Sequence, residues 1–184
     1  MEAEKVWEPS PAFVRSARIT AFADWLARER GLRFADYGAM WRWSVEDLEG
    51  FWGALWDWFD IRSASPRERV LVDRRMPGAR WFPGTTLNYV DQVFRHVTAD
   101  RPAIVFRNES GQARDIDWEE LRRETGALAA SLEAWGIGDG DRVAAYLPNI
   151  PEAATAFLAT AAIGAIWSAC SPDMGPVAVL DRVL

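Results

Sequence analysis

Apolar residues recur at helical spacing in the first part of the chain. The pattern predicts a helix that begins at Ser10-Pro11 and ends at Gly31. Serine is a good N-cap, proline suits the first helical turn, and glycine is a common residue just past a helix end. The apolar face of this predicted helix is formed by Val14, Phe22, Trp25 and Leu26.

A second helix is predicted to begin at Ser44, where Asp47 three residues later completes a pair that resembles a capping box. Its large residues fall on one stripe, which indicates a helix buried on that face. An aromatic ligand cage would use the same residue types, but core packing alone requires this spacing. The stripe is formed by Val45, Leu48, Phe51, Trp52, Leu55, Trp56 and Phe59.

Residues 61–80 are polar and contain Pro66, Pro77 and Gly78, which indicates a connecting segment. A further helix is predicted from about Thr86 or Asn88. Its inward face is formed by Leu87, Val90, Val93, Phe94 and Val97.

From residue 102 the pattern changes to short strands separated by helices. Residues 103–106 and 114–117 flank a turn-rich stretch and predict a β-hairpin. Asp117 with Glu120 can cap the next helix, which ends at Gly136. Its predicted inner face is Leu121, Leu128, Leu132 and Trp135. Beyond it we expect a strand over 142–147, a helix over 151–163, a strand over 165–169 and a helix from Pro176.

This order of strand, helix, strand, helix and strand predicts an α/β fold with a parallel sheet and right-handed crossovers. Eight of the 11 tryptophans lie in residues 1–81, so a helical, tryptophan-rich part precedes the sheet. The chain has 184 residues and is 49% hydrophobic, which is enough for a folded core.

Charge narrows the function classes. Residues 1–97 carry 14 basic and 14 acidic residues, whereas residues 98–184 carry 7 and 13, so the net charge of −6 comes from the second part. This acidic balance, with no basic stripe, argues against a nucleic-acid partner.

The longest apolar stretch, near 153–169, is too short and too weakly hydrophobic to span a bilayer, so we expect no membrane partner. No secretion signal precedes the first helix, and we expect a cytoplasmic protein.

Several motifs favour a structural role over chemistry. Gly84-Thr85-Thr86 lacks the second glycine and the lysine of a phosphate loop. The glycines at 136, 138 and 140 follow a helix and precede a strand, the reverse of a dinucleotide fingerprint, and indicate a helix stop and a turn. Cys170 is the only cysteine and Lys5 the only lysine, while His96 has no metal-binding or triad mate and is expected at the surface or in a cap.

The segment from Ile166 to Asp173 ends a strand and enters a loop before a helix. In open α/β sheets ligands bind at this edge, beyond the carboxyl ends of the strands. Ser171 and Asp173 could equally cap the following helix, and the residues alone leave both interpretations open.

Several motifs together are more specific than any one of them. They are Arg42-Trp43-Ser44-Val45, Trp81-Phe82-Pro83-Gly84 with Leu87-Asn88-Tyr89, Gly140-Asp141-Arg142-Val143 with Tyr146-Leu147-Pro148-Asn149, and Gly164-Ala165-Ile166-Trp167-Ser168 with Ser171-Pro172-Asp173 and Leu180-Asp181-Arg182. From about Val14 to Leu184, this series resembles the N-terminal portion of the acetoacetate–CoA ligases. These belong to the adenylate-forming acyl-CoA synthetase superfamily.

The resemblance implies an N-terminal helical cap over residues 1–98, with Trp81-Phe82-Pro83-Gly84 in its linker, followed by the start of an AMP-binding α/β domain over residues 99–184. Enzymes of this family activate a short acid such as acetoacetate with ATP and Mg²⁺ and transfer the acyl group to CoA. Their phosphate loop, adenine pocket, magnesium glutamate and catalytic lysine would follow Leu184. The resemblance therefore implies a fragment that is inactive alone, with no catalytic residue and no metal ligand.

In related acetate–CoA ligases a Phe-Gly-Gly loop beside CoA occupies the place of Ser171, Pro172 and Asp173. The resemblance implies that these three residues lie near CoA, although neither glycine is present here. Two other functions stay open: a non-catalytic scaffold or interaction module, and a fragment of a ligase for another short acid. A strand left without a neighbour, over 143–147 or 166–169, would also favour self-association.

Overall fold

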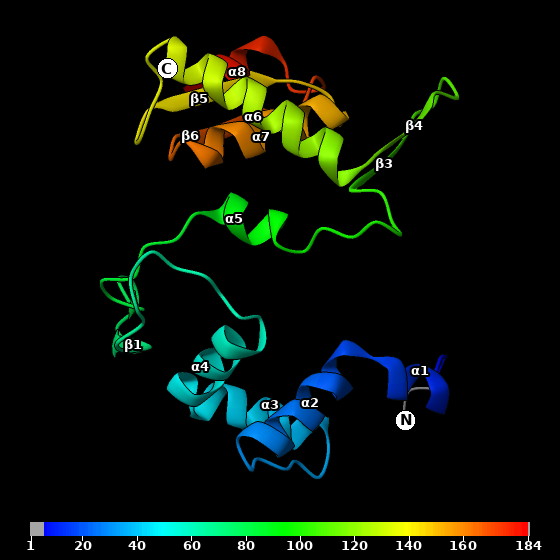
Figure 1. Cartoon of the computed structure of the whole chain (residues 1–184), viewed down its shortest axis with the longest axis vertical. Helices are drawn as coiled ribbons and strands as arrows, with labels where there is room; N and C mark the ends of the chain where they lie inside the picture. The colour runs from blue at the N-terminus through cyan, green and yellow to red at the C-terminus, as the bar shows by residue number, and fades with distance from the viewer. Residues whose placement is uncertain (1–5, 184) are drawn as a thin grey trace. The chain divides into compact units, whose positions relative to one another are not determined.

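The computed structural model describes residues 6–183, which form two compact units (Figure 1). The first unit extends to Thr85 and the second begins at Thr86. The division at residue 98 refers to the family's domains rather than to packing and stays a prediction.

The first unit opens with two short helices, α1 (Pro11–Ser16) and α2 (Arg18–Glu29), where one helix was predicted. The Ser10 side chain accepts a hydrogen bond from the Phe13 amide, which confirms the predicted N-cap. Ala17 is extended, with ψ 141°, and separates the helices. At this break the Val14 carbonyl has a local hydrogen-bond donor, because the Thr20 hydroxyl donates to it at 2.6 Å.

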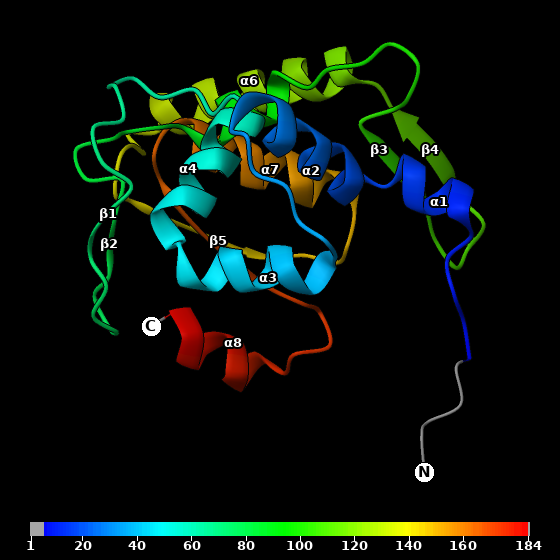
Figure 2. The ribbon, with the colours of Figure 1, turned by 90° about the horizontal axis from the view of Figure 1, so that it is seen from below.

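Two more helices follow, α3 (Tyr37–Glu46) and α4 (Leu48–Trp58), and they lie next to each other (Figure 2). The predicted start at Ser44 is wrong, because Ser44 lies inside α3 and its hydroxyl donates to the Trp41 carbonyl at 2.7 Å. Asp47 caps α4 instead, accepting from the Gly50 amide at 2.9 Å. Sequence reasoning missed α3, whose N-cap is Asp36.

The core of the first unit is formed by Phe22, Leu26, Met40 and Ala54, with aromatic rings around them. Trp58, which the predicted stripe left out, lies 5.7 Å from the ring centre of Phe22. Three members of the stripe are exposed: Val45 (47%), Trp52 (42%) and Phe59 (51%). The prediction of a uniformly buried stripe is therefore wrong, because α2 and α3 cover only part of it.

Residues 61–80 were predicted as a plain connection, but they include β1 (Leu71–Asp73), which pairs antiparallel with β2 (Arg80–Trp81). Arg67 attaches this segment to α4. Its guanidinium donates to the Gly53 carbonyl at 3.0 Å and pairs with Asp57 at 3.2 Å.

The second unit follows the predicted order of elements. They are α5 (Tyr89–Phe94), β3 (Ile104–Arg107), β4 (Ala113–Ile116), α6 (Trp118–Ala134), β5 (Arg142–Tyr146), α7 (Pro151–Ala162), β6 (Ile166–Cys170) and α8 (Pro176–Val183). Strands β3 and β4 form the predicted hairpin, with Ile104 opposite Ile116. Strands β5 and β6 pair in parallel, which confirms the α/β interpretation.

The core of the second unit is formed by Val90, Ile116, Leu121 and Leu158. Asp117 caps α6 as predicted, accepting from the Glu120 amide at 2.7 Å. Trp135 was predicted to face inward but is 74% exposed, because it follows the last residue of α6 where the chain turns away at Gly136. Leu87 and Val97 are also exposed, because both lie outside the short helix α5.

Each strand pair among residues 6–183 is a two-stranded sheet. No helix in this part of the chain combines the length and apolar composition that crossing a bilayer requires.

Candidate functional site

The parallel strands β5 and β6 end side by side. Tyr146 is the register partner of Cys170, and the Leu147 amide donates to the Cys170 carbonyl at 3.2 Å. One loop leads from β5 to the first residue of α7, Pro151, and another leads from β6 to α8. The carboxyl ends of parallel strands are the usual ligand edge of an α/β sheet. This edge is the candidate site.

The three residues singled out by sequence lie in the second of these loops, as their position after a strand predicted. The Ser171 hydroxyl donates to the Asp173 carboxylate. That bond, followed by the bond from the backbone N–H of Asp173, lowers the pKa of the Asp173 carboxyl below its usual 3.8. Asp173 is thus ionised at neutral pH and gives the loop a fixed negative charge.

The alternative role of Ser171 and Asp173 as helix caps is not seen. Helix α8 begins at Pro176, and the first-turn amide of Val179 bonds to the Gly175 carbonyl. The side chains of Ser171 and Asp173 bond to each other within the loop instead.

Sequence reasoning missed one residue at this edge. The Tyr146 hydroxyl lies 3.0 Å from the Pro172 carbonyl and 2.7 Å from the Met174 carbonyl, so the end of β5 is tied to the loop after β6. Two signals were available: a tyrosine, with an apolar ring and a polar tip, at the carboxyl end of a strand, and its place in the Tyr146-Leu147-Pro148-Asn149 motif.

An ion-pair cluster lies where β4, α6 and α7 meet. The Arg114 guanidinium is 2.6 Å from Glu120, 3.4 Å from Glu124 and 3.4 Å from Glu152. The hydrogen bond to Glu120, with the charges of all three acids, raises the pKa of Arg114. A hollow of about 510 Å³ adjoins the cluster at the start of α7. Because three acids already engage Arg114, the cluster is a structural tie rather than an anion site.

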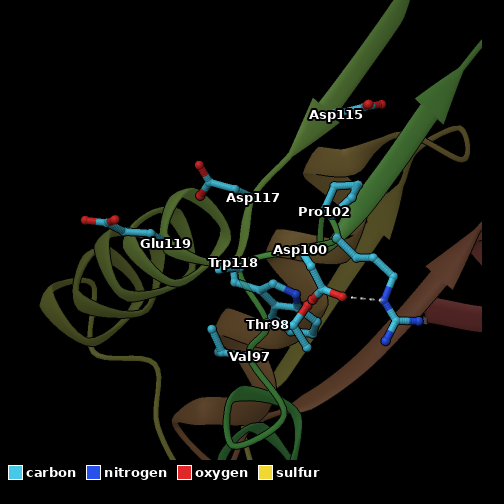
Figure 3. A pocket seen from close by; sticks show the side chains of 10 residues that line it. Val97, Thr98, Asp100, Pro102, Asp115, Asp117, Trp118 and Glu119 are labelled. Atoms are coloured by element: carbon cyan, nitrogen blue, oxygen red, sulfur yellow. Dashed lines mark ion pairs between the residues drawn. The ribbon is translucent and has the colours of Figure 1, made fainter.

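A second hollow, also about 510 Å³, adjoins the hairpin (Figure 3). Its wall contains four acids, and three of them have partners: Asp117 caps α6, and Asp115 pairs with Arg107 at 2.7 Å. Asp100 lies 3.8 Å from Arg101. Figure 3 shows the carboxylates of Asp115, Asp117 and Glu119 spread apart rather than converging on one point. This arrangement does not form a cation site.

The other motifs have structural roles. Gly84 has φ 74°, and the Thr85 amide bonds to the Phe82 carbonyl, so Gly84-Thr85-Thr86 begins in a tight turn. Gly136 and Gly140 have φ of 83° and 80° at the predicted helix stop and turn. His96 is exposed, and Cys170 is buried. Within residues 6–183 no group of His, Cys, Asp and Glu side chains could hold a metal, and Lys5 lies outside the described residues.

Known proteins are similar to this chain in sequence and in fold. The family model "AMP-binding enzyme" matches residues 91–183, and the model "Acetyl-coenzyme A synthetase N-terminus" matches residues 37–93. The chain is 41% identical to the acetoacetyl-coenzyme A synthetase of Rhizobium meliloti over 99% of its own length and 28% of that protein. It is 38% identical to the acetoacetyl-CoA synthetase of Xenopus tropicalis, over 99% of this chain and 27% of that one.

A solved structure, acetoacetyl-CoA synthetase from Streptomyces lividans, matches with a TM-score of 0.92 and 46% sequence identity. The match covers 98% of this chain and 28% of that one, so the chain spans little more than a quarter of the relatives it resembles. The described fold matches the N-terminal part of that enzyme. Because a family model matches half of its length, the chain belongs to the AMP-binding enzyme family.

Proposed function

We propose that a protein with this chain as its N-terminal part is an AMP-forming acetoacetate–CoA ligase. The observation that carries the proposal is the 46% identity and TM-score of 0.92 to the Streptomyces lividans synthetase over nearly the whole chain. In the proposed reaction the acetoacetate carboxylate attacks the α-phosphorus of ATP and releases pyrophosphate. The CoA thiolate then attacks the acyl carbon and releases AMP. Mg²⁺ accompanies ATP and neutralises charge on its phosphates.

Within this reaction we assign Ser171, Pro172 and Asp173 to the neighbourhood of CoA. The assignment is supported by their place at the carboxyl-end edge of β5 and β6. We assign no catalytic residue and no metal ligand to this chain. The 184 residues alone are proposed to be inactive, because no phosphate loop or suitably placed lysine is present in the sequence.

The test is a chimera in which this chain replaces the matching segment of the Streptomyces lividans synthetase. We expect acetoacetate-dependent exchange of pyrophosphate into ATP, and AMP release that also requires CoA. The isolated chain serves as the matched control and should show neither activity. A chimera with native helix content and melting behaviour but no acetoacetate-dependent exchange would refute the proposed function. That result would favour a non-catalytic module.

The acid is tested with the whole protein that has this chain as its N-terminal part. Acetoacetate should give a higher kcat/KM than acetate, propionate or butyrate at equal ATP and CoA. Better use of another short acid would show that the chain belongs to a ligase for that acid instead.

We also propose that the protein is cytoplasmic. The isolated chain is proposed to self-associate through the strand edges of β5 and β6. An edge strand offers unpaired N–H and C=O groups to another chain, and Ile166 on β6 is 52% exposed. The net charge of −6 supports the absence of a nucleic-acid partner. ATP, CoA and Mg²⁺ are not expected to bind tightly to the chain alone.

A further inference from the structure

The loop that joins β6 to α8 is not held by packing of the helix that follows it. Helix α8 buries none of its residues, and Val177 and Leu180 are 70% and 53% exposed. The bonds inside the loop are short-range, from the Ser171 hydroxyl to Asp173 and from the Met174 amide to the Ser171 carbonyl at 3.0 Å. Such bonds shape the loop but do not fix it against the sheet.

Tyr146 supplies the long-range contact. Its hydroxyl bonds to the carbonyls of Pro172 and Met174, residues 26 and 28 positions away in the sequence. A phenol has one hydrogen, so the two acceptors share it or alternate. Tyr146 is the last residue of β5 and is half-exposed, at 49%. Removing only the oxygen would therefore release the loop and leave the strand and its ring in place.

We propose that Tyr146 is a positioning residue that holds the 171–174 loop in the conformation that CoA binds. This inference rests on the proposed function, in which the loop lies beside CoA. Tyr146 acts through the Pro172 and Met174 carbonyls rather than by touching CoA. A loop already ordered before binding loses less conformational entropy when the ligand arrives, so the bond contributes to CoA affinity without taking part in the chemistry.

The first test is Tyr146→Phe in the active chimera. Loss of one neutral hydrogen bond predicts a rise of about fivefold in KM for CoA, with kcat and the KM for ATP unchanged. Tyr37→Phe is the matched control, because Tyr37 is 70% exposed at the start of α3 and should change none of these constants. An unchanged KM for CoA, or an equal rise in the KM for ATP, would overturn the proposal.

The second test uses the 184-residue chain itself and needs no activity. In Tyr146→Phe the Met174 amide should exchange its hydrogen about fivefold faster, while amides of β5, such as Ala144, keep their rates. Unchanged exchange at Met174 would show that the hydroxyl does not hold the loop.

The two tests separate the proposals. A folded chimera that forms no acetoacetyl-CoA refutes the proposed function, whatever the hydrogen-exchange rate of the Met174 amide. An active chimera in which Tyr146→Phe leaves the KM for CoA unchanged removes the role of Tyr146 and leaves the proposed function standing.

Discussion

The Asn88 side chain joins the start of one helix to the end of another, and its loss should destabilise the second unit measurably. Its carbonyl oxygen accepts from the Val90 amide at 2.9 Å and caps α5. Its amide nitrogen lies 2.9 Å from the Ala162 carbonyl and 3.3 Å from the Ala161 carbonyl, at the last turn of α7. Asn88 and Ala162 are 74 positions apart in sequence, so Asn88→Ala removes a local cap and a long-range tie together.

The magnitude follows from these bonds. Losing an N-cap costs about 1 kcal/mol. The bond to the Ala162 carbonyl adds about 1 kcal/mol, because this carbonyl lies at a helix end that offers no further intrahelical donor. The Ala161 carbonyl adds little, because it also accepts from the Gly164 amide at 3.2 Å. We therefore expect Asn88→Ala to lower the free energy of unfolding by ~2 kcal/mol, which lowers Tm by about 10 °C in a unit of this size.

Two variants separate the contributions. Asn88→Asp keeps an oxygen for the Val90 amide but has no N–H for the α7 carbonyls, and its charge repels them. The stability that Asn88→Asp loses should therefore come from the missing bond to the α7 carbonyls, and amides at the end of α7 should exchange faster. Asn149→Ala is the matched control, because Asn149 is exposed in the loop before α7.

The assay is urea unfolding followed by circular dichroism, together with hydrogen exchange at Val90 and along α7. The interpretation is wrong if Asn88→Ala and Asn149→Ala have the same unfolding free energy. It also fails if Asn88→Asp matches the wild type, because the tie to α7 would then contribute nothing.

Three further predictions concern other regions. Trp58→Ala should lower the free energy of unfolding by about 3 kcal/mol by opening the aromatic core, whereas the more exposed Trp52→Ala should cost less than half as much by urea unfolding. The pKa of Asp173 should lie below 3.8 by NMR titration and rise in Ser171→Ala. Because folding lowers this pKa, the bond from Ser171 to the Asp173 carboxylate stabilises the loop at neutral pH and is lost as pH falls through the lowered pKa. An unchanged pKa in Ser171→Ala would contradict the role of this bond. Light scattering should show an apparent mass that grows with concentration, and a constant monomer mass at high concentration would contradict edge pairing.

Local signals in the sequence were sufficient for most element boundaries in the second unit. Asp117 caps the helix that immediately follows it, and Asn88 was one of the two predicted starts of α5. The hairpin and the parallel strands followed from alternation and turn residues. Capping, turns and periodicity act over a few residues, so a single sequence contains the information.

Burial was less predictable, because it depends on what lies opposite. Trp52 and Trp58 occupy the same helix and have the same chemistry, but only Trp58 reaches Phe22 and Trp25. Trp135 continues the apolar pattern of α6 yet lies just past its end. Helical spacing defines a face, but it does not say how much of that face a neighbour covers.

The long-range ties made by Asn88 and Tyr146 have the same physical origin. Where an element ends, its last carbonyls have no further partner in that element, so a donor from elsewhere lowers the cost of leaving them inside a folded chain. Asn88 supplies that donor at the end of α7, and Tyr146 supplies it to the loop beyond the end of β6. Neither partner can be found from local pattern, since each depends on which ends the fold brings together. The ligand edge of an α/β sheet is made of such strand ends, so a positioning residue such as Tyr146 is the part of a site that sequence reasoning finds last.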